Sequence, residues 1–160
     1  MYLHGLDSKI SPEKKAILKK YGNVLAPDLN YYTNPDAIAT ILEMHKDEQV
    51  DVVIGSSMGG FAAYYVANAL NKPAMMFNPA LVERSVPQNI PANEKVNSLK
   101  YFLLGQVDDV VSPVDTLDFL TKHFNPVTNV HIHLVPQLGH NIPVEFFENE
   151  VGAFMGKLKL

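Results

Sequence analysis

The sequence contains no cysteine, and its lysines and arginines form no basic block. Without cysteine the chain forms no disulfide, no thiolate metal site and no cysteine nucleophile, which fits a reducing compartment. With a formal net charge of −4, the chain lacks the positive charge that favours binding to nucleic acid or to an anionic membrane. We therefore expect neither as a partner.

Long apolar segments are also missing. No apolar run reaches the 18 or so residues that a membrane-spanning helix needs. The opening stretch MYLHGLDSKI lacks the basic region and the hydrophobic core of a signal peptide. These absences favour a cytoplasmic protein.

The composition is that of an ordinary globular domain. Hydrophobic residues make up 47% of the 160 residues and charged residues 19%. A chain of this length can bury a core without disulfides or metals. We expect one domain over 1–160, in which 78–98 shows no clear periodicity and is a candidate flap.

The apolar pattern alternates between the periods of strands and helices. Strands are expected at 1–4, 23–27, 49–56, 73–78, 99–105 and 129–135. Helices are expected at 11–22, 34–46, 58–70, 112–124 and from 144 onward. Ser11, Asn34 and Ser112, each followed by proline, are predicted N-caps. Strands of this kind predict a mostly parallel, six-stranded sheet with helices on both faces.

The stretch Gly55-Ser56-Ser57-Met58-Gly59 lies where the third strand becomes a helix. A sharp strand–turn–helix corner holds its central residue in a strained conformation, and only small residues two positions away avoid a collision. The pattern predicts Ser57 as an exposed nucleophile, with Ser56 in a local packing role.

Two further candidates follow strands. Asp108 comes after the strand at 99–105, where a carboxylate could orient a histidine; its neighbour Asp109 is the rival. His140 comes after the last strand. In an open parallel sheet, sites lie beyond the carboxyl ends of the strands. The order Ser57, Asp108, His140 is the order of the triad in α/β-hydrolases.

Donors for a developing oxyanion are the fourth part of such a site. The Met58 N–H, at the start of the helix, is one candidate. The Leu6 N–H, in the loop His4-Gly5-Leu6, is the second, because Gly5 allows a tight backbone there. His4 is expected to brace this loop, with metal ligation as the alternative.

With these residues the sequence resembles the α/β-hydrolase superfamily, and more narrowly the small YqiA/YcfP-like bacterial esterases, which open on a YLHG loop. The resemblance covers nearly the whole chain. It implies Ser57 as nucleophile, Asp108 as acid and His140 as base. It also implies a three-layer sandwich with sheet order 4-3-5-6-7-8 in family strand labels, without the two leading strands and without a large cap domain.

The expected activity is cleavage of a carboxylic ester or thioester of a small or short-acyl substrate through an acyl-enzyme, without a cofactor. Residues expected to line the pocket are His4, Gly5, Leu6, Met58, Leu81, Val110, Leu138 and Ile142. Tyr31 and Tyr32 are expected either to line the cleft or to pack against other residues. Arg84 is expected to be a solvated surface residue. The alternative is that it binds an anionic part of the substrate.

Two other readings remain. His131 and His133 point to one face of a strand, as zinc ligands can, but the stretch HIHLVP supplies no nearby carboxylate. We therefore predict no metal site. The second alternative is a non-catalytic ligand-binding or protein-interaction module on a hydrolase scaffold, since fold does not imply activity. The physiological substrate and the oligomeric state are not encoded in these patterns.

Overall fold

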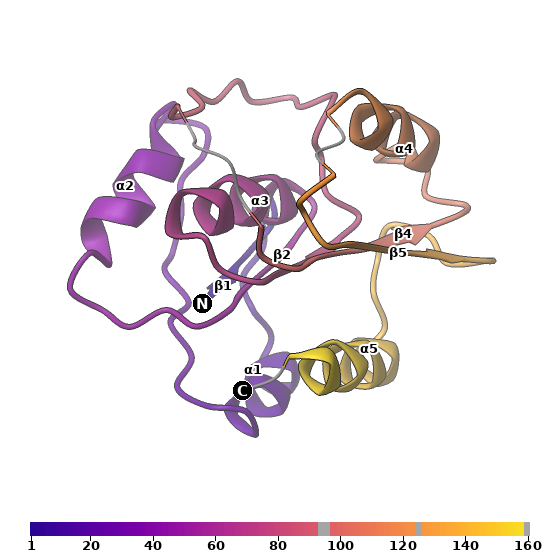
Figure 1. Cartoon of the computed structure of the whole chain (residues 1–160), viewed down its shortest axis with the longest axis horizontal. Coiled ribbons are helices and arrows are strands. Elements are labelled where there is room, and N and C mark those ends of the chain that lie inside the picture. The colour runs from indigo at the N-terminus through magenta and orange to yellow at the C-terminus, as the bar shows by residue number, and fades with distance from the viewer. Residues whose placement is uncertain (93–96, 124–125, 159–160) are drawn as a thin grey trace.

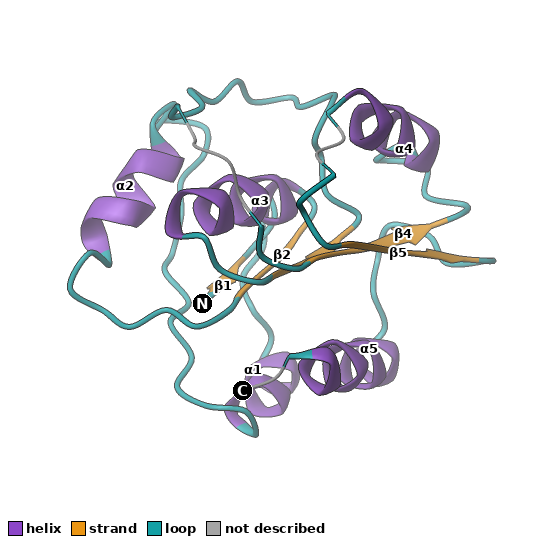
Figure 2. Cartoon of the chain, in the orientation of Figure 1, coloured by secondary structure: helices purple, strands orange, loops and turns teal. Residues whose placement is uncertain are grey.

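The computed structural model describes residues 1–92, 97–123 and 126–158. In this part of the chain, a parallel sheet lies between two layers of helices (Figure 1; Figure 2). The strands, in their spatial order, are β1 (Tyr2–Leu3), β2 (Val53–Ser56), β3 (Ala74–Phe77), β4 (Lys100–Gly105) and β5 (Val130–Val135). The α/β-hydrolase-like three-layer architecture is confirmed.

The helices divide between the two faces of the sheet. In Figure 1, α2, α3 and α4 cover one face, and α1 and α5 cover the other. Their bounds are α1 (Pro12–Lys19), α2 (Ala37–Met44), α3 (Met58–Leu70), α4 (Pro113–Lys122) and α5 (Val144–Lys157). α3 follows β2 directly and lies against the middle of the sheet.

Alternating residues of the strands belong to two separate apolar clusters. Phe102 and Leu104 of β4 pack with α2 and α3, whereas Tyr101 and Leu103 pack with α1 and α5. Strands that are buried on both faces in this way are typical of parallel sheets. β5 is the exception, because it lies at the edge of the sheet and its residues alternate between exposed and half-buried.

The prediction of a sixth strand at 23–27 is wrong. The described sheet therefore lacks the edge strand that stands first in the predicted order 4-3-5-6-7-8. In this stretch the Leu25 carbonyl accepts a hydrogen bond from the Tyr2 N–H at 2.7 Å. β1 is only two residues long, and Pro27 has no N–H to donate to a ladder. The segment lies beside β1 without forming a strand.

The predicted helix caps had mixed outcomes. The hydroxyls of Ser11 and Ser112 accept hydrogen bonds from the N–H three residues on, as expected. α2 begins at Ala37, three residues after the cap predicted at Asn34. The Asn34 side chain instead accepts from the Asp36 N–H in a turn that precedes the helix. The predicted end of α4 at Phe124 lies outside the described residues.

The candidate flap contains no helix or strand in its described parts, 78–92 and 97–98. The buried Gln88 anchors it, donating to the carbonyls of Tyr31 and Asn34 and accepting from the Ala37 N–H. No helix in the described chain is long and apolar enough to cross a membrane.

The close approach of α3 to the sheet depends on glycine. A Cβ built on Gly59 would lie 2.1 Å from the Leu3 carbonyl oxygen, and one on Gly55 would lie 2.1 Å from the Gly59 carbonyl oxygen. Backbone atoms cannot give way as flexible side chains can. Any larger residue at these two positions would push α3 away from β1 and β2.

We predict opposite effects for two glycine-to-alanine substitutions. Gly59→Ala should lower the free energy of unfolding by about 3 kcal/mol, through overpacking against the sheet. Gly156→Ala should raise it by about 0.5 to 1 kcal/mol, because a Cβ on this α5 glycine would meet no atom of the described residues within 4 Å and alanine is the better helix former. Urea unfolding of both variants checks this; equal values would contradict the close contact.

Candidate active site

Ser57 occupies the strained corner that the sequence predicts. Its backbone angles are φ 54° and ψ −121°, a conformation that non-glycine residues seldom adopt. The corner is held on both sides. The Ser57 N–H donates to the Phe77 carbonyl at 2.9 Å, and its carbonyl accepts from the N–H groups of Phe61 and Ala80. In the described chain its hydroxyl makes no hydrogen bond and remains available for chemistry.

His140 and Asp108 form a direct pair. The His140 Nδ1 lies 2.8 Å from the Asp108 Oδ2, and the Asp108 side chain is almost completely buried. The other carboxylate oxygen accepts from the N–H groups of Val110 and Val111 at 2.8 and 2.9 Å. The rival Asp109 is exposed. This network fixes the carboxylate, and hence the ring that it contacts.

The sheet places these three residues at one edge. Ser57 follows β2, Asp108 lies three residues beyond β4, and His140 lies five residues beyond β5. All strands are parallel, so their carboxyl ends point the same way. The loop after β4 also bonds the loop after β5, where the Val107 N–H donates to the Leu138 carbonyl at 3.1 Å. The Nε2 of His140 has no hydrogen-bond partner in the described chain.

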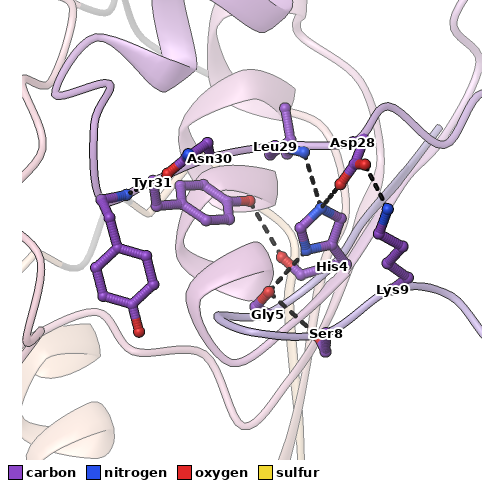
Figure 3. Close-up of polar contacts among 9 residues, drawn as sticks. His4, Gly5, Ser8, Lys9, Asp28, Leu29, Asn30 and Tyr31 are labelled. Atoms are coloured by element: carbon purple, nitrogen blue, oxygen red, sulfur yellow. Dashed lines mark hydrogen bonds and ion pairs between the residues drawn. The ribbon is translucent and has the colours of Figure 1, made fainter.

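His4 braces the loop that carries Leu6, as expected. Figure 3 shows its ring between two backbone groups. Nδ1 lies 2.7 Å from the Gly5 carbonyl oxygen, and Nε2 accepts the Leu29 N–H at 2.9 Å. This arrangement requires the proton on Nδ1, so neither ring nitrogen is free to bind a metal. The Tyr31 hydroxyl donates to the His4 carbonyl and holds the brace in place (Figure 3).

The brace also sets the direction of the Leu6 N–H. The Gly5 carbonyl accepts from both His4 and the Ser8 hydroxyl. In a trans peptide the C=O and the following N–H point in opposite directions. The Leu6 N–H therefore points away from His4, and it has no acceptor among the described residues. The Met58 N–H likewise has none there, so both predicted oxyanion donors are unpaired.

The residues predicted to line a pocket do not form one group. His4 and Leu6 line a cavity of about 550 Å³ together with Tyr31 and Tyr32. Val110 is 68% exposed. The other predicted lining residues belong to the packed interior, fully or in part: Gly5, Met58, Leu81, Leu138 and Ile142.

Arg84 is not the solvated surface residue that the sequence suggests. Its guanidinium lies 4.2 Å from the ring centroid of Phe61, and its Nη1 donates to the Leu81 carbonyl at 2.7 Å. Its contacts thus tie the start of the candidate flap to α3.

The stretch HIHLVP itself supplies no carboxylate, but the fold brings one from another element to the strand histidines. Glu150 of α5 places its Oε2 3.1 Å from the His133 Nδ1 and accepts from the Tyr101 hydroxyl at 3.0 Å. His131 stacks on the Tyr101 ring instead. The described residues contain no group of three or more His, Asp or Glu side chains able to hold a metal ion.

Comparison with known proteins identifies the family. The model of the uncharacterised protein family UPF0227 matches residues 1–110. The chain belongs to this family. The match includes Ser57, Asp108 and the loop at His4, and it ends before His140. No curated protein sequence matches the chain.

Solved structures share the fold over nearly the whole chain. One is a Xanthomonas campestris pv. campestris protein described as a hydrolase of the alpha/beta superfamily (TM-score 0.70, 15% identity, 98% of this chain and 97% of that one). Another is the Bacillus cereus carboxylesterase (0.66, 16%, 98% and 87%). A third is Arabidopsis thaliana SOBER1 (0.65, 14%, 99% and 97%). At these identities the likeness concerns the fold.

Because His4 braces the loop that carries Leu6, we predict a loss of stability when its side chain is removed. His4→Ala removes the acceptor of the Leu29 N–H and one of the two donors to the Gly5 carbonyl, and should cost about 1 to 3 kcal/mol in the free energy of unfolding. Hydrogen exchange at the Leu29 amide should become faster. His123→Ala, which removes an exposed ring at the end of α4, is the control and should cost clearly less. Equal losses and an unchanged Leu29 amide would contradict the brace.

Proposed function

We propose that the protein is a serine hydrolase that cleaves a carboxylic ester or thioester of a small or short-acyl substrate. The observation that carries the proposal is the His140–Asp108 hydrogen bond at 2.8 Å, at the same sheet edge as the strained Ser57 corner. A serine is a weak nucleophile until an adjacent base takes its proton. An imidazole whose Nδ1 is held by a carboxylate presents Nε2 as that base.

The proposed reaction begins with attack by Ser57. His140 Nε2 takes the proton from the Ser57 Oγ as that oxygen bonds to the substrate carbonyl carbon. The Leu6 and Met58 N–H groups donate to the resulting oxyanion, and the start of α3 adds the positive end of its dipole there. The C–O or C–S bond then breaks, and His140 returns the proton to the leaving oxygen or sulfur.

Hydrolysis of the acyl-enzyme completes the cycle. His140 removes a proton from water as the water oxygen attacks the acyl carbon. The bond between that carbon and the Ser57 Oγ then breaks, His140 returns the proton to the Oγ, and the acid leaves. Asp108 keeps the His140 proton on Nδ1 and stabilises the positive ring that forms in each step. No cofactor takes part in this scheme.

The substrate class rests on the small size of the scaffold and on its fold relatives. Of these, one is named a carboxylesterase, and Est1E from Butyrivibrio proteoclasticus was solved with ferulic acid bound. We propose that residues 1–160 act as one minimal hydrolase domain in the cytoplasm, with 78–98 as a short flap. Without a larger cap, small or short-acyl substrates fit best.

Active-site labelling tests the nucleophile. A fluorophosphonate probe should add once to the wild type and to Ser56→Ala, and not to Ser57→Ala, as measured by intact mass. Ser56→Ala is the matched control because it changes the adjacent serine. A folded wild type that takes up no probe would contradict the proposal and favour a ligand-binding module.

The adjacent carboxylates of Asp108 and Asp109 allow a matched test of which one is the acid of the triad. Asp108→Asn should lower kcat on a short-chain p-nitrophenyl ester by about 10⁴-fold, because the amide holds the wrong tautomer of His140. Asp109→Asn should retain wild-type activity, since Asp109 is exposed. Comparable losses in the two variants would contradict the assignment of Asp108.

A further inference from the structure

Asn78 is a buried polar residue whose contacts lie at the centre of the candidate site. It follows β3, the strand between the one that leads to Ser57 and the one that leads to Asp108. Only 2% of its surface is exposed, and its φ of 44° is in the left-handed region. Asparagine tolerates this backbone better than most residues.

The Asn78 carboxamide bonds two separate loops. Its Nδ2 donates to the carbonyl oxygens of Gly139 at 3.0 Å and His140 at 3.1 Å. Its Oδ1 accepts from the Gly105 N–H at 2.7 Å. Its own N–H donates to the Leu103 carbonyl at 2.8 Å. A buried amide whose two N–H groups and carbonyl are all used is well defined in position.

These contacts reach both partners of the His140–Asp108 pair through the backbone. Gly105 ends β4 and accepts a hydrogen bond from the Asp108 N–H at 3.2 Å, so it fixes the start of the loop that carries the carboxylate. The two Nδ2 bonds fix the peptide groups on either side of the His140 Cα. The loops also pack tightly, since a Cβ on Gly105 would lie 2.4 Å from the Leu138 carbonyl oxygen.

We infer that Asn78 is a positioning residue that sets the His140 ring against Asp108 by holding the loops after β4 and β5 to the end of β3. The inference rests on the proposed function. A displacement of about 1 Å in a reacting group can cost about 10²-fold in rate. Asn78 therefore affects kcat although it touches neither the substrate nor the imidazole.

Two substitutions separate this role from general packing. Asn78→Asp keeps the shape, the tolerance of positive φ and the acceptor for Gly105, but it places an oxygen opposite the Gly139 and His140 carbonyls. Asn78→Gly removes the side chain and suits the backbone. The controls are Asn71→Asp and Asn71→Gly, because Asn71 has a similar φ of 49° but caps the far end of α3.

Kinetics and NMR provide the readouts. Both Asn78 variants should lose about 10²-fold in kcat on a p-nitrophenyl ester, with KM little changed, and should react with a fluorophosphonate correspondingly more slowly. The downfield proton resonance of the His140 Nδ1–H, hydrogen-bonded to Asp108, should shift or disappear in both. The Asn71 variants should keep wild-type kcat and the resonance.

The outcomes distinguish the two proposals. If folded Asn78 variants keep the resonance and the labelling rate, Asn78 does not position the pair and the inference is overturned. If the wild type neither labels nor turns over ester, the proposed function fails, and the resonance alone still decides the role of Asn78. If an Asn78 variant does not fold, hydrogen exchange of the wild-type Asn78 carboxamide protons is measured instead. Fast exchange of these protons with solvent would overturn the inference.

Discussion

The candidate site depends on the contact between the start of α3 and the sheet. Gly59 leaves room for the Leu3 carbonyl, and Gly55 leaves room for the Gly59 carbonyl, so the corner that holds Ser57 at its positive φ lies directly against the sheet. The loop that carries Leu6 also comes close to the serine, since a Cβ on Gly5 would lie 3.3 Å from the Ser57 Cβ. The strain at Ser57 is offset by hydrogen bonds from its backbone to β3 and to the segment after it.

Polar side chains then fix the loops that the sheet brings together. His4 orients the Gly5–Leu6 peptide, and Asn78 connects the loops of Asp108 and His140. Each of them binds backbone groups on elements that are distant in the sequence. Such fully paired buried networks favour one conformation, because any alternative leaves a buried donor or acceptor unpaired. A rigid site of this kind suits chemistry that requires donors set in advance of the reaction.

The sequence predicted the parts of the molecule that depend on local patterns. The corner at Ser57, the caps at Ser11 and Ser112 and the order of strands and helices all follow from short-range geometry. The strand at 23–27 was predicted wrongly because pairing depends on the neighbour, and β1 is too short to pair with it. The roles of Asn78 and Gln88 had no local signal, since their partners come from segments that only the fold brings together.

A crystal structure of the protein after reaction with a fluorophosphonate would show which residue is the nucleophile and where the oxyanion lies. We expect a phosphorus–oxygen bond to the Ser57 Oγ, with the phosphoryl oxygen about 2.7 to 3.1 Å from the Leu6 and Met58 nitrogens. His140 Nε2 should lie within hydrogen-bond distance of the adduct, and its Nδ1 should remain on Asp108. An adduct on another residue, or a phosphoryl oxygen turned away from both N–H groups, would contradict the account.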